Sequence, residues 1–397
     1  MEIHQKLNVL FWRVGFYGAL TQGGVASLYR GLLDAFVRLG HRTIFASSGP
    51  MNLPDETEFH LIEYSKLLRN LPEILTFPYN ESSLKAVLKI VEKNRPDFFY
   101  LHHHDFHYGG AKIKEKTGLP FILHFDSIEY WVKKNWGKLY FGNLLKWCEQ
   151  IEVAQADAIV TISDVLKKQA CEFYNIPPDK VYPVPNGVDT SKFHPDIDGT
   201  EIRKKYGLEG KYVVGYSGTF NAYHGVDLIA AAAKKIMSKI PNSVVLFIGD
   251  GALREKVEDI LTQDGIREKV VITGLIPFDE VPKHIAACDL MVSPIIHDHK
   301  DEFFGTPIKH YEYKAMGKPI IASNIGTLKD IFEHCVNSYV IEPNSVDAIV
   351  DAVIELYDNP DLSNSIAKSA RIDAKEKHSW EVNAKKIIDI YHKINRK

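Results

Sequence analysis

The stretch FFGTPIKHYEYKAMGKPIIAS, residues 303–323, reads as a loop, a helix and a buried strand. We expect Thr306 to cap the helix, Pro307 to occupy its first position and Gly317 to end it. This prediction places Lys309 at the third helical position, where free N–H groups and the helix dipole favour an acid. A cation at this position indicates that an anion from elsewhere binds there.

The same alternation of apolar runs and amphipathic helical segments extends along almost the whole chain. The runs are apolar on both faces, as in parallel strands that helices cover on both sides. They form two series: residues 7–12, 42–47, 97–102, 120–125, 157–162 and 180–185, then residues 212–217, 243–249, 269–274, 289–294 and 318–323. Alternating strands and helices predict a doubly wound α/β fold, and two series predict two copies of it.

The joint between the two series is residues 185–200, which are rich in turn formers and lack periodicity. We therefore expect an N-terminal doubly wound α/β domain over residues 1–187, a second one over 188–376, and a final amphipathic helix over 377–397. Ligands bind past the carboxyl ends of the strands in open α/β sheets. The active site is therefore expected in a cleft between the two domains.

Composition narrows the class of protein. The chain has 397 residues, of which 45% are hydrophobic and 25% charged, and its net charge of −3 gives no basic field for nucleic acid. Its cysteines lie far apart without a C-x-x-C pair, which is typical of free thiols in a reducing compartment. The sequence shows no secretory signal and no stretch that would span a bilayer, so we expect a cytoplasmic protein.

Glycine-rich turns follow several predicted strands. Gly23 and Gly24 precede a helix, Gly218 opens the second domain, and Gly249 and Gly251 follow the next strand. Such turns can hold a phosphate or a polar sugar with bare N–H groups, or they can be tight turns and nothing more. The first turn lacks G-x-G-x-x-G, which argues against a dinucleotide enzyme.

A dense polar run, LHHHDFHYGG, follows the strand that ends near residue 102. Histidine and aspartate at this density suit zinc, whereas the alternative is the polar wall of a cleft. Adjacent residues on an extended strand point apart, so we favour the wall and expect no metal. The residues concerned are His102, His103, His104, Asp105 and His107.

His124, Asp126 and Glu129 follow the next predicted strand, at the sheet edge where ligands bind. A histidine there could bond a phosphate oxygen or a sugar hydroxyl, or it could be a structural histidine. The lysines and aromatic residues over 131–147 could lie on a membrane surface, although such a run more often combines helix packing with a solvated face.

Six stretches together resemble the family-4 glycosyltransferases of the GT-B fold. The resemblance implies two facing Rossmann-like domains, with the acceptor mainly on the first and a nucleotide-sugar on the second. It also implies transfer with retention at the anomeric carbon, no catalytic metal, and a final helix that crosses back to the first domain. The stretches are GGVASLYRGLLDAFVRLGH (23–41), ADAIVTISDVLKKQA (156–170), VYPVPNGVDTSKFHP (181–195), GDGALREKVE (249–258), ITGLIPFDEVPKHIAACDLMVSP (272–294) and KHYEYKAMGKPIIAS (309–323).

The resemblance also assigns residues to the nucleotide-sugar. Lys309 and the free N–H groups of its helix would hold the donor diphosphate, and Glu312 would bind the ribose as the second glutamate of the E-x7-E motif. The sequence departs from the family at Phe304, where the first glutamate is expected. The remaining residues expected around the diphosphate are Gly218, Thr219, His224, Gly305 and Thr306, of which Thr219 and His224 replace the usual Arg and Lys.

The sequence thus predicts a retaining, metal-independent glycosyltransferase without a cofactor. We expect a UDP-sugar donor, with a GDP-sugar next, and a glycan or lipid-linked glycan acceptor reached at the inner membrane face through residues 131–147. His124 is expected to contact the transition state, and Asp126 and Glu129 to orient the acceptor. Two alternatives stay open: a nucleotide-sugar epimerase or phosphorylase on the same scaffold, and a non-catalytic sugar-nucleotide binder. The sequence sets no oligomeric state.

Overall fold

The chain divides into two α/β units, of which the first is made of two separate segments. The computed structural model describes residues 6–14, 23–63, 76–135, 137–296 and 303–396. The first unit comprises Met1–Pro185 and Trp380–Lys397, and the second comprises Asn186–Ser379. The boundaries expected from the sequence, after residues 187 and 376, lie two and three residues from these.

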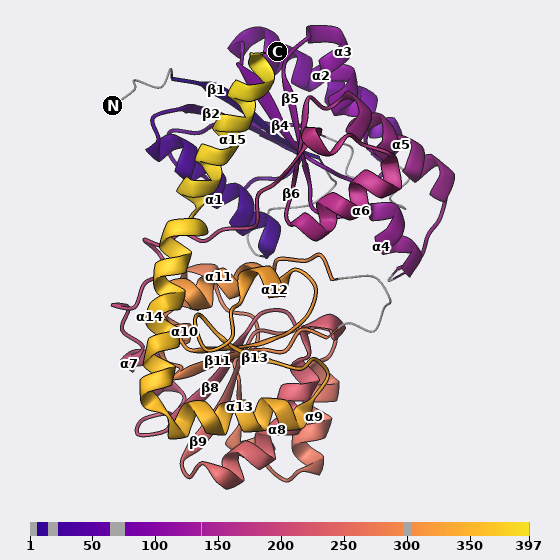
Figure 1. The fold of residues 1–397 in the computed structure, drawn as a ribbon. Coiled ribbons are helices and arrows are strands. Elements are labelled where there is room, and N and C mark those ends of the chain that lie inside the picture. The colour runs from indigo at the N-terminus through magenta and orange to yellow at the C-terminus, as the bar shows by residue number, and fades with distance from the viewer. Residues whose placement is uncertain (1–5, 15–22, 64–75, 136, 297–302, 397) are drawn as a thin grey trace. The chain divides into compact units, whose positions relative to one another are not determined.

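In the described part of the first unit, seven strands form one parallel sheet in the order β3-β2-β1-β4-β5-β6-β7 (Figure 1). Four consecutive residues of the first strand, residues 9–12, are fully buried, as expected for a strand that helices cover on both faces. The strands are β1 (Asn8–Arg13), β2 (Arg42–Ser47), β3 (Glu58–Leu61), β4 (Phe98–His102), β5 (Phe121–Phe125), β6 (Ala158–Thr161) and β7 (Val181–Pro183).

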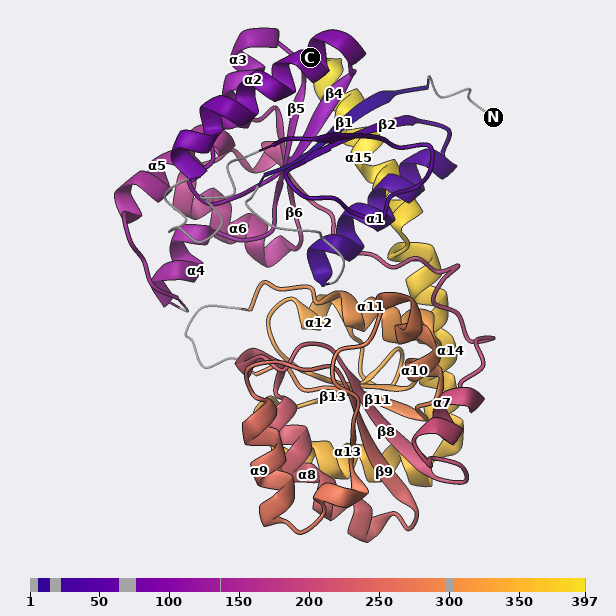
Figure 2. The same ribbon diagram turned by 180° about the vertical axis from the view of Figure 1, so that it is seen from behind.

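Helices cover both faces of this sheet (Figures 1 and 2). The C-terminal helix α15 (Trp380–Asn395) packs against α1 (Gly24–Arg38). A Cβ atom on Gly31 would lie 2.1 Å from the Trp380 indole nitrogen, so glycine is what allows this close packing. The other helices of the unit are α2 (Thr76–Asn94), α3 (Gly109–Thr117), α4 (Glu129–Asn135), α5 (Gly142–Gln155) and α6 (Asp164–Tyr174).

The described part of the second unit contains a six-stranded parallel sheet in the order β10-β9-β8-β11-β12-β13. Its strands are β8 (Tyr212–Ser217), β9 (Ser243–Ile248), β10 (Val271–Ile272), β11 (Leu290–Ser293), β12 (Ile320–Ser323) and β13 (Tyr339–Ile341). Successive strand residues enter separate cores on the two faces: Val213 joins one and Val214 the other. The predicted pair of doubly wound sheets is therefore confirmed.

Eight helices of the described residues surround the second sheet. The helix α8 packs against both α9 and α13, and α11 packs against α14 (Figure 2). Their bounds are α7 (Thr200–Lys205), α8 (Val226–Lys239), α9 (Arg254–Gln263), α10 (Val281–Ala286), α11 (Ile308–Ala315), α12 (Leu328–Ile331), α13 (Val346–Asp358) and α14 (Pro360–Lys377). In the described part of the chain, no helix combines the length and the apolar character that crossing a membrane requires.

Each sheet reverses its strand order once, between β1 and β4 in the first unit and between β8 and β11 in the second. Loops leave opposite faces at such a reversal, and ligands bind there past the carboxyl ends of the strands. In the first unit, β4 ends at His102 and the neighbouring β5 carries His124. In the second unit, Gly218 follows β8 and the chain after β11 leads to Lys309. The fold thus positions the residues of both candidate sites.

Candidate active site

His124 lies near the carboxyl end of β5 and is almost fully buried. Its Nδ1 atom is 2.7 Å from the Tyr100 hydroxyl, whereas its buried Nε2 atom has no hydrogen-bond partner among the described residues. Burial, together with the smaller effect of the neighbouring His102, lowers the pKa of His124 to about 3. The imidazole is therefore neutral at physiological pH and has one nitrogen atom available to a ligand.

Asp126 follows β5 and contacts the end of β4. Its Oδ2 atom is 3.0 Å from Nε2 of His102, and the rings of His102 and His124 stack with centroids 5.1 Å apart. Burial by itself raises the pKa of Asp126, but the charge and hydrogen bond of His102 outweigh it and lower the pKa below its ordinary value. A third of the Asp126 side chain is exposed, so an ionised carboxylate faces solvent here.

Glu129 is the first residue of α4, and its carboxylate accepts a hydrogen bond from the Ser127 hydroxyl. Burial raises the pKa of Glu129 to about 8, and the nearby charges of Asp105 and Asp126 act in the same direction. Glu129 is therefore largely protonated at neutral pH and can donate a hydrogen bond, whereas Asp126 can only accept one. The sequence-predicted trio thus contains a neutral base, a carboxylate and a carboxylic acid.

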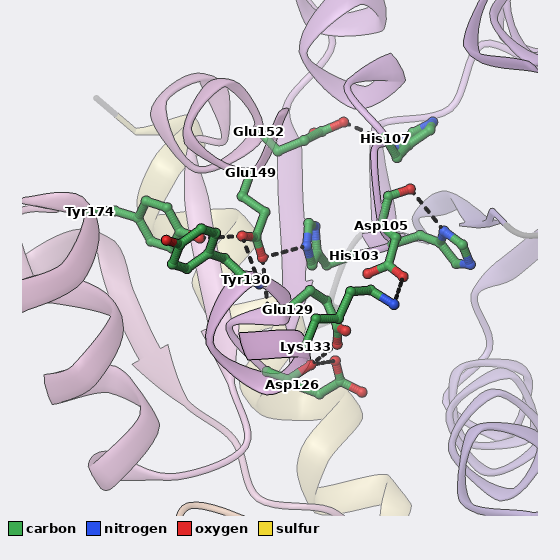
Figure 3. Close-up of polar contacts among 12 residues, drawn as sticks. His103, Asp105, His107, Asp126, Glu129, Tyr130, Lys133, Glu149, Glu152 and Tyr174 are labelled. Carbon is green, nitrogen blue, oxygen red and sulfur yellow. Dashed lines mark hydrogen bonds and ion pairs between the residues drawn. The ribbon is translucent and has the colours of Figure 1, made fainter. Parts of the chain in front are cut away.

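Glu149 on α5 organises this part of the unit and was not predicted from the sequence (Figure 3). Its carboxylate is fully buried and accepts hydrogen bonds from the Tyr174 hydroxyl at 2.5 Å and from Nε2 of His103 at 3.1 Å. It also accepts the backbone N–H groups of Glu129 and Tyr130, at 2.8 and 3.2 Å. Glu149 therefore fixes the N-terminus of α4 and, with it, the position of Glu129.

The polar run over residues 102–107 separates toward different partners (Figure 3). His103 bonds Glu149; although burial opposes its charged form, this hydrogen bond outweighs burial and raises the pKa of His103 to about 9. Nδ1 of His107 lies 3.2 Å from Glu152, and Asp105 forms a 2.8 Å ion pair with Lys133. Of this run, His102 is the residue that lies beside His124 and Asp126.

The segment over residues 131–147 exposes several aromatic side chains. Tyr140 is 66% exposed, Phe141 61% and Trp147 48%, although large hydrophobic side chains ordinarily turn inward. Three lysines of the segment are also exposed, namely Lys134, Lys138 and Lys146. Trp136 lies outside the described residues. The sequence expectation of a helix with a solvated polar face therefore does not account for these aromatic rings.

The first glycine turn precedes α1. Gly23 has a φ of 92°, which L residues with a side chain rarely adopt, and its carbonyl accepts the Ser27 N–H at 3.1 Å. Gly24 is the first helical residue, and no side chain caps the helix. Within the described residues, the N-terminus of α1 therefore has no side-chain cap on its first N–H groups; the preceding residues 15–22 lie outside that part of the chain.

The two glycine loops of the second unit pack on each other. A Cβ atom on Gly249 would lie 2.0 Å from the Gly218 carbonyl oxygen, and one on Gly251 would lie 2.7 Å from the Phe220 nitrogen. The close approach lets the Phe220 N–H bond the Asp250 carbonyl at 2.9 Å. Gly249 and Gly251 thus allow the close packing that supports the loop carrying Gly218.

Lys309 is a buried lysine in the first turn of α11. It is 7% exposed, and its Nζ atom is 3.1 Å from Nδ1 of His224 and 3.3 Å from the Tyr216 hydroxyl. Burial lowers the pKa of Lys309 to about 7, and Glu312 offsets part of this effect. Burial and the Lys309 charge together lower the pKa of His224, so its neutral ring accepts from the ammonium group.

Glu312 lies one helical turn after Lys309 and is equally buried. Burial raises the pKa of Glu312 to about 7, while the Lys309 charge acts against this effect. Among the described residues, no ion pair joins the two side chains. Lys309 and Glu312 therefore both titrate near neutral pH, and such shifted pKa values are typical of ligand-binding and active sites.

The start of α11 differs from the sequence prediction. Pro307 has an extended ψ of 128° and precedes the helix, so Ile308 is the first helical residue and Lys309 the second. Thr306 does not cap the helix. Its hydroxyl and carbonyl oxygens instead accept hydrogen bonds from the Asn186 amide at 3.1 and 2.9 Å. Asn186 holds Thr306 away from the helix, and the first N–H groups of α11 stay without a side-chain cap.

At the positions that depart from the family pattern, packing and neutral hydrogen bonds replace the expected charged groups. Phe303 and Phe304 are both buried, and a Cβ atom on Gly305 would lie 2.7 Å from the Phe303 ring. The backbone carbonyl of Thr219 accepts the Tyr216 hydroxyl at 2.8 Å, which holds that hydroxyl beside Lys309. Apolar and neutral groups thus occupy positions where the family pattern expects charges.

Solved structures of other proteins share this architecture over nearly their whole length. A glycosyltransferase from Rickettsia africae superimposes with a TM-score of 0.74 and 18% identity, covering 99% of this chain and 100% of that one. The HepE protein of Anabaena, solved in complex with UDP, gives a TM-score of 0.75 and 16% identity, with 98% and 100% covered. The fold is therefore that of the GT-B glycosyltransferases.

Family models identify both halves of the chain. Residues 22–192 match the model described as glycosyltransferase family 4, and residues 198–373 match the one described as glycosyl transferases group 1. The chain belongs to the family-4 glycosyltransferases, and its class of activity is glycosyl transfer.

Relatives with curated descriptions are glycosyltransferases as well. An uncharacterized glycosyltransferase of Methanocaldococcus jannaschii is 26% identical over 97% of both chains. The UDP-Gal:α-D-GlcNAc-diphosphoundecaprenol α-1,3-galactosyltransferase of Escherichia coli is 24% identical over 78% of both. The GDP-mannose-dependent α-(1-6)-phosphatidylinositol monomannoside mannosyltransferase of Mycobacterium tuberculosis is 28% identical over 52% of this chain and 54% of its own.

Proposed function

We propose that the protein transfers a sugar, with retention and without a metal ion, from a nucleotide-diphosphate sugar to a glycan or lipid-linked glycan. The observation that carries the proposal is the buried ammonium group of Lys309. It lies in the first turn of α11, and no carboxylate of the described residues is within ion-pair distance of it. Burying an unpaired charge is costly, so the site is built for an anion that arrives with a ligand.

A diphosphate suits this environment. Its two negative charges complement the Lys309 ammonium together with the uncapped N–H groups and positive dipole end of α11. Gly218 leaves the space beside the lysine open, since a Cβ atom there would lie 3.5 Å from Cδ of Lys309. His224, neutral and bonded to Lys309, sets the position of the ammonium group. Lys309 thereby takes the role of the two basic residues that Thr219 and His224 replace.

We assign the ribose of the donor to Glu312. A carboxylate accepts hydrogen bonds from two neighbouring hydroxyls at once, which suits the ribose diol. The raised pKa of Glu312 means that part of the population is protonated in the empty site near pH 7. Binding of the ribose hydroxyls then favours the ionised form, because hydrogen bonds to the charged form lower a carboxyl pKa.

The first unit supplies the groups that we assign to the reaction itself. Retention without an enzyme nucleophile requires stabilisation of the leaving group and positioning of the acceptor, not covalent catalysis. The unpartnered Nε2 atom of His124 serves as a preorganised contact that strengthens in the transition state. The Asp126 carboxylate and the protonated Glu129 orient acceptor hydroxyls, because one accepts and the other donates hydrogen bonds.

For the donor we favour a UDP-sugar, with a GDP-sugar next. The E. coli relative takes its name from UDP-Gal, and the Anabaena structure holds UDP, whereas the mycobacterial relative is named for GDP-mannose. For the acceptor we favour a lipid-linked glycan, since the names of both relatives state lipid-linked acceptors. The exposed aromatic residues and lysines over 131–147 would then bind the cytoplasmic face of the membrane.

A panel of nucleotide-sugars tests the proposal. Each UDP-, GDP- and ADP-sugar is added to the protein, and its thermal unfolding is followed. A donor present at 100 times its dissociation constant stabilises the folded protein by about 2.7 kcal/mol. The stabilising donor is then supplied in labelled form with membrane extract as acceptor. Label in a glycan or lipid product supports the proposal; an isomerised donor, or binding without turnover, contradicts it.

A further inference from the structure

Three potential metal ligands converge at the carboxyl end of the first sheet. One atom each of His102, His124 and Asp126 lies within 4.8 Å of the other two. The two histidines come from the adjacent strands β4 and β5, where they are paired in register. In-register residues of neighbouring parallel strands point to the same face, and Asp126, two residues after His124, continues on that face.

The available atoms are held in place by their neighbours. Nδ1 of His124 is occupied by the Tyr100 hydroxyl at 2.7 Å, which leaves the buried Nε2 atom as the only free ligand atom of that ring among its described contacts. A hydrogen bond on the second ring nitrogen is the usual support of a metal-binding histidine, because it fixes the tautomer and the ring orientation. On the other side, Oδ2 of Asp126 lies 3.0 Å from Nε2 of His102.

From this geometry we propose that His102, His124 and Asp126 form a binding site for a divalent transition-metal ion, Zn²⁺ by preference. Two imidazoles and one carboxylate are a known ligand set of zinc, whereas Mg²⁺ prefers oxygen ligands alone. The Asp126 side chain is one third exposed, so water reaches the remaining coordination position.

The spacing fits an ion after small movements. Bonds of roughly 2.0–2.2 Å in a tetrahedral site separate neighbouring ligand atoms by about 3.4 Å. The observed 3.0 Å between His102 and Asp126 therefore widens by a few tenths of an ångström when an ion enters. The other separations lie within 4.8 Å, so the remaining adjustment is at most about 1.4 Å and is shared between rotation of Asp126, beyond the end of β5, and small shifts of the two imidazoles.

The charge environment sets the strength of binding. Arg13 is in register with His102 on the neighbouring strand β1, and its positive charge opposes a second cation. We therefore expect a site that fills and empties reversibly, unlike a closed structural zinc site. A bound ion occupies Nε2 of His124. If His124 acts in sugar transfer as proposed above, Zn²⁺ inhibits the enzyme, and a chelator restores it.

Cobalt(II) is the probe for the site, because its visible absorption reports imidazole coordination without any enzymatic activity. Co²⁺ is titrated into the full-length protein and into the His102→Gln and Asp126→Asn variants. The control is His104→Gln, which changes a histidine of the same run outside the trio. We expect one bound Co²⁺ in the parent and in the control, displaced by Zn²⁺, and loss of the band in both trio variants. Thermal unfolding confirms that each variant is folded.

Two results overturn the metal site: no Co²⁺ band in the parent protein, or a band that persists in folded Asp126→Asn and His102→Gln. A second measurement addresses inhibition separately. Zn²⁺ is expected to slow sugar transfer in the parent and in His104→Gln, and to leave each trio variant at its own metal-free rate. Co²⁺ binding without Zn²⁺ inhibition would support the metal site but contradict the role proposed for His124 in sugar transfer. Failure of the metal-site proposal and failure of the proposed function are therefore distinguishable.

Discussion

Replacement of Lys309 by methionine separates the charge of this side chain from its packing. Methionine fills a similar apolar volume on α11 and removes the ammonium group that contacts His224 and Tyr216. If that group holds the donor diphosphate, the variant loses a charge-assisted hydrogen bond. The expected loss is about 1.5–3 kcal/mol, which corresponds to roughly a 10- to 150-fold weaker dissociation constant.

Stability is expected to change in the opposite direction. The pKa of Lys309 is about 7 in the folded protein, against 10.5 for an ordinary lysine in water. The folded pKa lies below the unfolded one, so the folded state loses stability as the pH falls from 10.5 to 7. At 1.36 kcal/mol per pKa unit the full cost is on the order of 5 kcal/mol. The empty Lys309→Met variant is therefore expected to be more stable than the parent at pH 7.

Isothermal titration calorimetry with a UDP-sugar measures both the affinity and the proton balance. A UDP-sugar is suitable because its diphosphate is a diester and does not titrate near pH 7. At pH 7 Lys309 is about half protonated and Glu312 about half ionised in the empty site, so the half proton that Lys309 takes up on donor binding is offset by the half proton that Glu312 releases. At pH 8 Lys309 takes up nearly one proton and Glu312 releases little, so the uptake by Lys309 is measured there. Parallel titrations in two buffers of different ionisation enthalpy give this number, and donor affinity falls as the pH rises above 7.

The matched control is Lys329→Met, which removes an exposed lysine from the first turn of another helix of the same unit, α12. We expect the control to bind the donor as the parent does and to take up the same fraction of a proton. The reasoning is refuted if Lys309→Met binds with parental affinity, or if its binding still takes up the proton.

Further predictions concern the remaining groups. His124→Ala is expected to lower kcat by about 100-fold or more with little change in donor affinity; steady-state kinetics decides this, and a change confined to KM contradicts it. Glu312→Gln is expected to weaken donor binding in titrations more than it lowers kcat, and the reverse order would reject the ribose assignment. Activity is expected to survive EDTA; loss that Mg²⁺ or Mn²⁺ restores would mean that the diphosphate is held by a cation. Liposomes with anionic lipid are expected to float the protein in a salt-sensitive manner, and replacement of Tyr140, Phe141 and Trp147 by serine to reduce this; no flotation of the parent leaves a soluble acceptor.

The two sheets were predictable because their strands are short runs that are apolar on both faces and bounded by turn residues; the shortness of the runs distinguishes them from buried helices, which are longer. The strands β3 and β13 were missed for the opposite reason. β3 carries Glu58 and His60 at the sheet edge, and β13 has three residues, too few for a period to be visible. Alternation therefore identified the interior strands and the edge strands β7 and β10, and failed at the opposite edge of each sheet.

The start of α11 and the role of Glu149 depended on contacts between distant residues. Thr306 has the chemistry of a helix cap. However, the side-chain amide of Asn186, 120 residues earlier in the chain, donates hydrogen bonds to its carbonyl and hydroxyl oxygens. In the sequence, Glu149 and Glu152 are compatible with a solvated helix face. In the structure both are buried on α5, together with Leu145 and Val153. Two glutamates at helical spacing within an apolar stripe are the signal that could have indicated a buried network. Their partners among the histidines of residues 102–107 could not be derived from local spacing.

The most direct test of the central claim is a crystal structure of the protein with UDP. The account predicts that the diphosphate lies at the N-terminus of α11, with a phosphate oxygen within hydrogen-bonding distance of Nζ of Lys309, and with the ribose hydroxyls bonded to Glu312. A diphosphate bound elsewhere, for example at the bare N-terminus of α1 after Gly23, with Lys309 still bonded only to His224 and Tyr216, would contradict it.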